Sequence, residues 1–179
     1  MKNFSIDARQ IRSAMIMQAK NDIRYCLNGI LIGDGKVVAT DGHRIIVVDS
    51  PKSNFKPTIF SIKGKIPKKA IDCEFVFIGE DYGVVMSKDG KGSDIDAVVK
   101  FSVVEGRFPD YKRVIPKGDG DKISKVGFNI DYLSDVSKAA KELGSTYSGG
   151  EFEFHEASVL IRVKTPENKA KCVIMKMRL

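Results

Sequence analysis

The side chains best suited to chemistry are two histidines and three cysteines, and their spacing argues against a catalytic or metal site. Cys26, Cys73 and Cys172 lie far apart and form no Cys-x-x-Cys pair, so neither a zinc site nor a disulfide framework is expected. His43 and His155 have no cysteine or second histidine nearby. We therefore expect reduced thiols, no bound metal and no cofactor.

One pair of residues has the types needed for acid–base chemistry. Asp41 and His43 alternate on one short segment, but no serine or cysteine nucleophile accompanies them. Two glycine-containing segments also fail as sites: residues 33–36 lack the spacing of a P-loop, and residues 89–94 do not fit an EF-hand calcium loop. The sequence therefore predicts a protein that is not an enzyme, with a surface hairpin at residues 89–94.

A short strand motif occurs three times along the chain. Its copies are Phe4-Ser5-Ile6-Asp7, Phe60-Ser61-Ile62-Lys63 and Phe128-Asn129-Ile130-Asp131. Apolar residues at helical spacing follow the first and third copies, at residues 8–19 and 133–143. The second copy leaves room for only a turn or two of helix from Pro67.

Three strand-forming runs complete each copy. They are residues 25–32, 36–40 and 44–48 in the first unit, 74–78, 83–87 and 97–104 in the second, and 151–155, 158–164 and 171–179 in the third. The sequence thus predicts an α+β fold of three strand–helix–three-strand units. Asp119-Gly120-Asp121 is a plausible linker before the third unit.

Composition bounds the class of protein. The 179 residues are 42% hydrophobic, which suffices for a packed core. No apolar stretch is long enough to cross a bilayer and none near Met1 reads as a secretory signal, so we expect a cytoplasmic protein without a membrane partner. The formal charge of +7 is compatible with a polyanionic partner without requiring one.

Three segments resemble the bacterial DNA polymerase III beta subunit, the replicative sliding clamp. They are Ala39-Thr40-Asp41-Gly42-His43-Arg44, residues 107–116 (Arg-Phe-Pro-Asp-Tyr-Lys-Arg-Val-Ile-Pro) and Met175-Lys176-Met177-Arg178-Leu179. The resemblance implies a DNA clamp fold in which residues 1–117 form one full domain, 118–125 a linker and 126–179 a half-domain. Residues 1–117 resemble the family's middle domain, and residues 126–179 the second half of its last domain.

In that family the three segments converge on a groove that binds the short peptides of replication proteins. Such a groove needs apolar walls and a few polar groups that orient the peptide backbone. Carried over by motif, its residues are Leu27, Thr40, Gly42, His43, Arg44, Ile45, Pro109, Val114, Val173, Met175, Met177, Arg178 and Leu179. Lys176 stands where the family usually has a proline, which would place a mobile cation in the groove. Taken alone, Met175 and Met177 also fit the alternate core positions of a last strand.

The resemblance also implies a surface that contacts DNA through phosphates, without sequence specificity. The first helical segment carries Arg9, Arg12 and Lys20 with no acidic residue between positions 8 and 21, and in the family this helix lines the central hole. The full set of expected DNA contacts is Arg9, Arg12, Lys20, Arg24, Tyr25, Lys65, Lys68 and Lys69. For any one of these basic residues, a solvated surface charge is the competing interpretation.

Two functions follow from the resemblance. The first is a clamp-like processivity factor that holds duplex DNA and tethers a polymerase or other replication proteins, with a clamp loader as a further candidate partner. The second is a clamp-fragment regulator, encoded by a phage or other mobile element, that occupies clamp-binding peptides without encircling DNA. Exposed sheet edges also predict self-association, as a homo-oligomer or with a partner that completes the fold. Both functions require the carboxyl-terminal strand to lie beside the Thr40–Ile45 turn.

Overall fold

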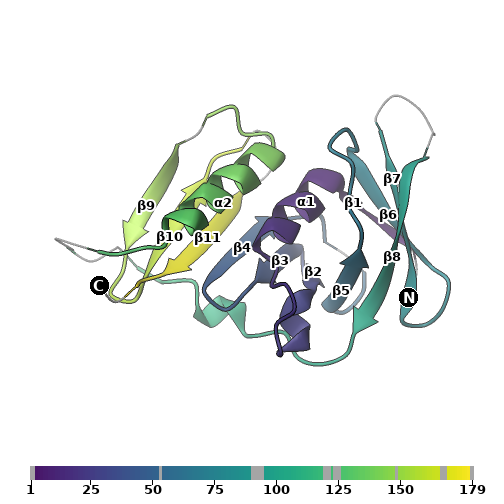
Figure 1. Ribbon diagram of the computed structural model, residues 1–179, viewed down its shortest axis with the longest axis horizontal. Helices are drawn as coiled ribbons and strands as arrows, with labels where there is room; N and C mark the ends of the chain where they lie inside the picture. Colours follow the sequence, from purple (N-terminus) through teal and green to yellow (C-terminus); the bar gives the residue numbers. More distant parts are fainter. Residues whose placement is uncertain are drawn as a thin grey trace.

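The computed structural model describes residues 3–52, 54–89, 95–118, 122, 126–147, 149–165 and 169–177. Within these ranges the strands form one 11-stranded sheet, in the order β1-β6-β7-β8-β5-β2-β3-β4-β11-β10-β9. Every pairing in it is antiparallel. The helices α1 and α2 contact each other and lie on one side of the sheet (Figure 1). The predicted α+β class is confirmed.

The elements follow the three predicted units. The first unit contains β1 (Phe4–Asp7), α1 (Ala8–Met17), the 3-10 helix η1 (Tyr25–Asn28), β2 (Ile30–Gly33), β3 (Lys36–Thr40) and β4 (Arg44–Asp49). The second contains β5 (Thr58–Lys63), β6 (Asp72–Phe77), β7 (Tyr82–Lys88) and β8 (Ile95–Val104), followed by the 3-10 helix η2 (Tyr111–Arg113). The third contains α2 (Ile130–Glu142), β9 (Gly150–Phe154), β10 (Ser158–Val163) and β11 (Ala170–Met175).

The motif strands are exchanged between the first two units. Strand β1 pairs with β6 of the second unit, and β5 pairs with β2 of the first. Phe4 on β1 stacks on Phe75 of β6 at a ring separation of 4.7 Å, while Phe60 on β5 packs at 5.2 Å against the same ring. This exchange gives the two units one aromatic core, so they fold as a single body.

Helix α1 has a clear sequence signal at its start. The Asp7 carboxylate accepts a hydrogen bond from the backbone N–H of Arg9 at 2.8 Å, which caps the helix. Ile11 and Ala14 on the same face are fully buried against the sheet. The cap and the apolar stripe together explain why a helix of only ten residues forms here.

Two predicted helix and strand assignments were wrong. Residues 25–28 form η1 rather than a strand, because the Asn28 side chain accepts from Asp22 N at 2.9 Å, donates to Asp22 O at 2.8 Å and closes the segment into a loop. In place of the short helix expected from Pro67 there is a turn, closed by Ala70 N donating to Pro67 O. Arg12 donates to Pro67 O and Ala70 O, at 2.9 and 2.8 Å, and so binds this turn to α1.

The third motif copy is also not a strand. Asn129 caps α2, its side chain accepting from Asp131 N at 2.9 Å, and only Gly127 makes a bridge, to Met177. The predicted hairpin tip at residues 90–94 lies outside the described residues. Of the predicted linker, only Gly118 and Lys122 are described, and the division into one domain and a half-domain stays a prediction.

Strand pairing and ion pairs to α2 join the first and third units. Strand β11 pairs with β4 along the register Ala170↔Val48 to Ile174↔Arg44, which makes the sheet continuous. On the helix side, Arg12 of α1 pairs with Glu142 of α2 at 2.6 Å. These contacts fix the third unit against the first, and the groove described next lies along the sheet junction.

Candidate functional site

The junction of β4 and β11 forms the floor of a groove. Ile45 and Val173 are directly opposite each other in the ladder, and both are buried. Just beyond the ladder, Met175 N donates to His43 O at 3.0 Å. The carboxyl-terminal strand therefore lies beside the Thr40–Ile45 turn, as both predicted functions require.

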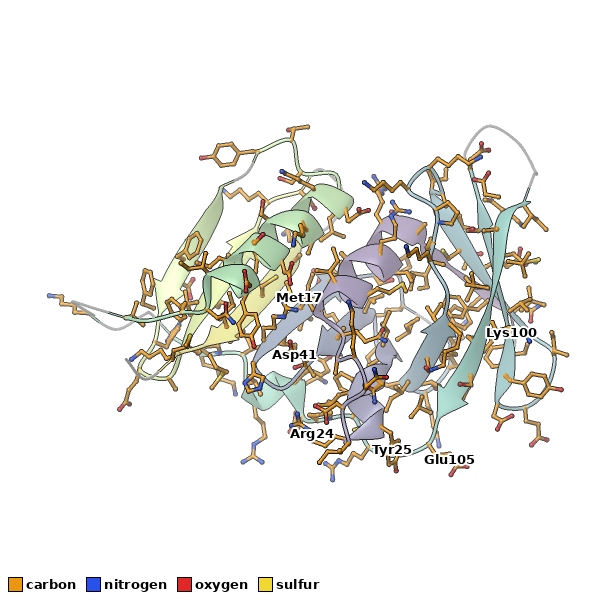
Figure 2. All side chains as sticks on the ribbon, viewed as in Figure 1. Met17, Arg24, Tyr25, Asp41, Lys100 and Glu105 are labelled. Carbon is orange, nitrogen blue, oxygen red and sulfur yellow. The ribbon has the colours of Figure 1, made fainter. Side chains whose placement is uncertain are left out.

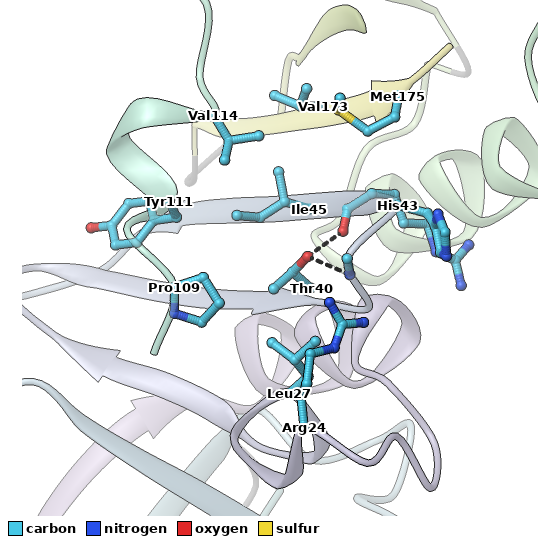
Figure 3. Close-up of a pocket in the computed structure, with 12 residues that line it drawn as sticks. Arg24, Leu27, Thr40, His43, Ile45, Pro109, Tyr111, Val114, Val173 and Met175 are labelled. Carbon is cyan, nitrogen blue, oxygen red and sulfur yellow. Dashed lines mark hydrogen bonds between the residues drawn. The ribbon is translucent and has the colours of Figure 1, made fainter. Parts of the chain in front are cut away.

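A pocket of about 230 Å³ opens on this floor (Figure 3). Its lining residues come from β3, β4 and the turn between them, from the connection after β8, from β11, and from η1 with the residue before it, and they include members of all three predicted segments. They are Arg24, Leu27, Thr40, Gly42, His43, Arg44, Ile45, Pro109, Tyr111, Val114, Val173 and Met175. Most of this lining is apolar, with polar groups gathered at the turn end. An apolar cleft with a polar rim suits a peptide with apolar anchors.

The polar end of the groove is a tightly held turn. Thr40 Oγ1 donates to Arg44 O at 2.7 Å and accepts from Gly42 N at 3.0 Å. The Asp41 carboxylate accepts from the backbone N–H groups of His43 and Arg44, at 2.9 and 3.1 Å. Gly42 has φ +90°, a backbone conformation that residues other than glycine rarely adopt. This turn explains the spacing of the Thr-Asp-Gly-His-Arg segment.

Arg44 links the turn to α2. Its guanidinium donates to Asp41 at 3.0 Å and to Asp135 at 2.5 Å, and it lies 4.7 Å over the Tyr132 ring. Although partial burial acts in the opposite direction, hydrogen bonds from Lys138 and Arg44 lower the pKa of Asp135 below 3.8. Since the Arg44 side chain is only 11% exposed, most of its charge is used within the fold.

The opposite wall comes from the connection after β8. Phe108 is buried in a second hydrophobic cluster with Ile45, Val173 and Leu160, on the sheet face away from the main core. That anchor places Pro109, Tyr111 and Val114 over the groove, where Val114 remains 43% exposed. The connection is thus held by apolar packing rather than by pairing in the sheet.

Arg24 extends the groove toward an exposed edge. It donates to both carboxylate oxygens of Asp22, at 3.0 and 2.8 Å, and to Asp41 O at 3.4 Å. The hydrogen bonds from Arg24 lower the pKa of Asp22 to about 2. Figure 2 shows Arg24 and Tyr25 on the same edge of the molecule. The Tyr25 ring is 61% exposed there.

Ten of the predicted groove residues line the pocket together. They are Leu27, Thr40, Gly42, His43, Arg44, Ile45, Pro109, Val114, Val173 and Met175. Met177 does not line it: the residue is 50% exposed and its N–H donates to Gly127 O. Lys176 is not among the described residues that line this pocket, and its effect on the groove stays a prediction. Arg178 and Leu179 lie outside the described residues.

Two lining residues were not predicted for the groove. Arg24 was assigned to DNA, and Tyr111 was not singled out, although it lies within the predicted segment 107–116. The signal that could have found Tyr111 is its position between Pro109 and Val114, two residues that were assigned.

The residues predicted to contact DNA are more scattered. Lys20 is exposed beyond the carboxyl end of α1. Lys68 is exposed in the 67–70 turn near the amino end of α1, and Lys65 is exposed just before that turn. Arg9 pairs with Asp7 at 2.6 Å, and Lys69 pairs with Asp96. Arg12 is 11% exposed and is held by Glu142 and two carbonyls. The arginines of α1 therefore use their charge inside the fold, contrary to what an acid-free helix suggests.

Two features of the described residues concern metal ligands and reactive thiols. No group of three or more His, Cys, Asp and Glu residues there is arranged to hold a metal ion. The three cysteines are free, and burial raises the pKa of Cys73 and of Cys172 to about 12, so neither is a reactive thiolate. Among the described residues, no helix is both long and apolar enough to span a bilayer.

Comparison with known proteins gives a consistent answer. The beta sliding clamp of Salmonella typhimurium is 30% identical over 169 residues, covering 90% of this chain and 45% of the relative. That of Pseudomonas aeruginosa is 28% identical over 180 residues, covering 93% of this chain and 48% of the relative. The chain therefore spans about half the length of the curated relatives it matches. No protein-family model matches it.

Solved structures agree on the fold. The DNA polymerase III subunit beta of P. aeruginosa superposes with a TM-score of 0.62 at 22% identity, covering 100% of this chain and 67% of that one. The H. pylori beta clamp, solved in complex with diflunisal, gives a TM-score of 0.67 at 14% identity, covering 98% and 66%. These structures show the fold alone. The curated relatives, which match 90% and 93% of this chain, place it in the beta sliding clamp family.

Proposed function

We propose that this chain is a non-enzymatic, clamp-like processivity factor whose groove binds the short extended peptides of polymerases and other replication proteins. The supporting observation is the single groove made by the Thr40 turn, the connection after β8 and β11. Three segments far apart in sequence supply it, which general core packing does not require. Family membership supports the same function.

The chemistry of the groove indicates what the peptide carries. Leu27, Ile45 and Val173 form an apolar floor that would receive large apolar side chains. Burying each anchor would contribute roughly 1.5–3 kcal/mol, so two anchors suit a weak, exchangeable complex. Met175, 37% exposed at the rim, supplies a deformable contact for more than one partner.

A fluorescently labelled polymerase-tail peptide tests the groove. Met175→Ala removes a lining side chain and is expected to weaken binding about three- to tenfold. Met177→Ala is the matched control, because Met177 is exposed nearby but does not line the groove. Equal losses for the two variants, or no binding by the unmodified chain, would count against the proposal.

We also propose weak, sequence-independent contact with duplex DNA on the helix side. Lys20, Lys65 and Lys68 support it best, because each is exposed and none of the ion pairs among the described residues includes them. Arg24 and Tyr25 would add a cation and a stacking surface at the neighbouring edge. Retention on circular but not on linear duplex would identify encirclement, and equal retention would indicate simple adhesion.

Encirclement requires more than one copy, so the proposal includes a homo-oligomer. A clamp loader that opens the assembly is part of the same proposal. The regulator that binds peptides without encircling DNA receives no support from the curated relatives, which are named beta sliding clamps. It would return as the explanation if the chain bound the peptide but never retained circular DNA.

A further inference from the structure

Strand β9 of the third unit lacks the cover that its counterparts β2 and β6 have in the first and second units. Among the described residues, β2 pairs with β5 and β3, and β6 pairs with β1 and β7, whereas β9 pairs with β10 alone. It is therefore one of the two ends of the 11-stranded sheet, at the edge of the molecule in Figure 1. Its outer row of backbone N–H and C=O groups is available for pairing.

Strands β6 and β9 share a short sequence pattern, but their phenylalanines differ in exposure. Strand β6 contains Glu74-Phe75-Val76-Phe77 and β9 contains Glu151-Phe152-Glu153-Phe154. In β6 the first phenylalanine is fully buried beneath β1. In β9 the corresponding Phe152 is 46% exposed, and Phe154 is 37% exposed. The third unit thus keeps the aromatic pattern of a covered strand without a cover in this chain.

The same edge carries a hollow beside its exposed rings. A cavity of about 150 Å³ lies between α2 and the sheet, lined by Leu133, Val136, Ser137, Ala140, Gly149, Gly150, Phe152, Ile161 and Val163. Gly150 leaves it open at the strand edge, because no side chain projects there. A surface with a protruding aromatic and an adjacent apolar hollow is complementary to a second copy of itself.

We propose that β9 pairs antiparallel with β9 of a second copy across a twofold axis, with Phe152 opposite its own equivalent. In this register Phe154 of each copy stands opposite Gly150 of the other and enters the hollow under α2. Aromatic cover of an edge glycine is a known stabilising arrangement in sheets. Strand β9 contains no lysine, proline or bulge that would block such pairing.

The register also sets the charges at the contact. On the outer face Glu151 of one copy stands opposite Glu153 of the other. Glu153 is already paired with Arg162, which donates to it at 2.9 and 2.6 Å. Glu151 remains as the repulsive residue. Reversing its charge would therefore create two new ion pairs per dimer and strengthen the contact.

The test is the mass of the full chain by light scattering over a range of concentrations. We expect a rise from one copy of 19.8 kDa to two. Phe154→Asp should raise the midpoint concentration by about tenfold or more. Glu151→Lys should lower it, and Ile78→Asp, which removes an exposed apolar residue far along the sheet, should leave it unchanged. A thermal melt of each variant checks folding. Should Phe154→Asp fail to fold, the result for Glu151→Lys alone tests the pairing.

Three outcomes would overturn the pairing. A chain that stays a monomer at every concentration excludes it, as does weaker association of Glu151→Lys. Growth beyond two copies would indicate head-to-tail pairing of β9 with β1, the other end of the sheet. The edge lies two strands from the groove junction, so loss of dimerisation with unchanged peptide binding would leave the proposed groove function standing.

Discussion

Single residues in this chain serve the groove mainly by holding its backbone. Arg24 belongs to both proposed binding surfaces, since it lines the peptide groove and lies at the edge proposed to contact DNA. Its partner Asp22 keeps it in place through two hydrogen bonds. Peptide and DNA would therefore meet the same guanidinium, a consequence of the loop before η1 folding back on the turn.

This ion pair makes a prediction about pH. A depressed carboxyl pKa means that the pair is fully formed above 3.8, the ordinary value, and is lost as the pH falls through about 2. Arg24→Ala should return the pKa of Asp22 toward 3.8, measured by NMR titration of the side-chain carboxyl. Arg113→Ala is the control, because Arg113 does not contact Asp22. An unchanged titration in Arg24→Ala would show that the contact does not persist in solution.

For single residues, the sequence motifs predicted the groove-lining positions well, but they did not predict which basic side chains are paired with acids. Thr40, Gly42 and His43 are close in sequence, and a tight turn fixes their relation wherever it occurs. The partners of Arg12 are Glu142 and the 67–70 turn, which are distant in sequence. An acid-free helix therefore looked basic, although the acids that neutralise it come from elsewhere in the fold.

Among the elements, the turn between β3 and β4 has the largest effect on the groove. The Asp41 side chain holds two backbone N–H groups and the Arg44 guanidinium. We expect Asp41→Ala to lower the free energy of unfolding by about 1–2 kcal/mol, because these donors lose their acceptor. Peptide affinity should fall as well. Urea unfolding and peptide titration measure the two effects.

Asp131→Ala is a matched control, since Asp131 is exposed in the first turn of α2 and is not among the groove-lining residues. If Asp41→Ala lost stability without losing affinity, the turn would be structural only.

The helices and strands themselves were largely predictable from the sequence, because period-2 and helical patterns are local. The third motif copy was wrongly predicted as a strand, because the Asn129 side chain caps α2 by accepting a hydrogen bond from Asp131 N.

The whole molecule depends on the attachment of the third unit to the first. Besides the β4–β11 ladder, Arg12 and Glu142 join the two helices, with side chains only 11% and 25% exposed. Removing Arg12 leaves Pro67 O and Ala70 O without this donor, so we expect Arg12→Ala to cost about 3 kcal/mol. Glu142→Gln should cost less. A double-mutant cycle by urea unfolding should give a coupling of about 1 kcal/mol or more.

No coupling would mean that the Arg12–Glu142 pair does not hold the units together, and that the ladder and the Arg44–Asp135 pair suffice. The order of units along the sheet could not be derived from the sequence, since β1 and β5 exchange partners and nothing local specifies it. The resemblance supplied what periodicity could not. It did not predict the contact between the two helices or the Arg12–Glu142 ion pair.

The last prediction concerns how the folded molecule presents its net charge to DNA. If Lys20, Lys65 and Lys68 make the contacts, replacing all three by Gln should reduce the slope of log affinity against log salt by up to about 3. Lys112, Arg113 and Lys117 provide a control of equal charge, since they lie on the connection after β8 rather than beside α1. Filter binding on a short duplex over a salt series measures both triple variants. Equal slopes for the two triple variants would mean that DNA affinity depends only on the overall charge of the protein. That result would contradict the proposal that the helix side faces DNA.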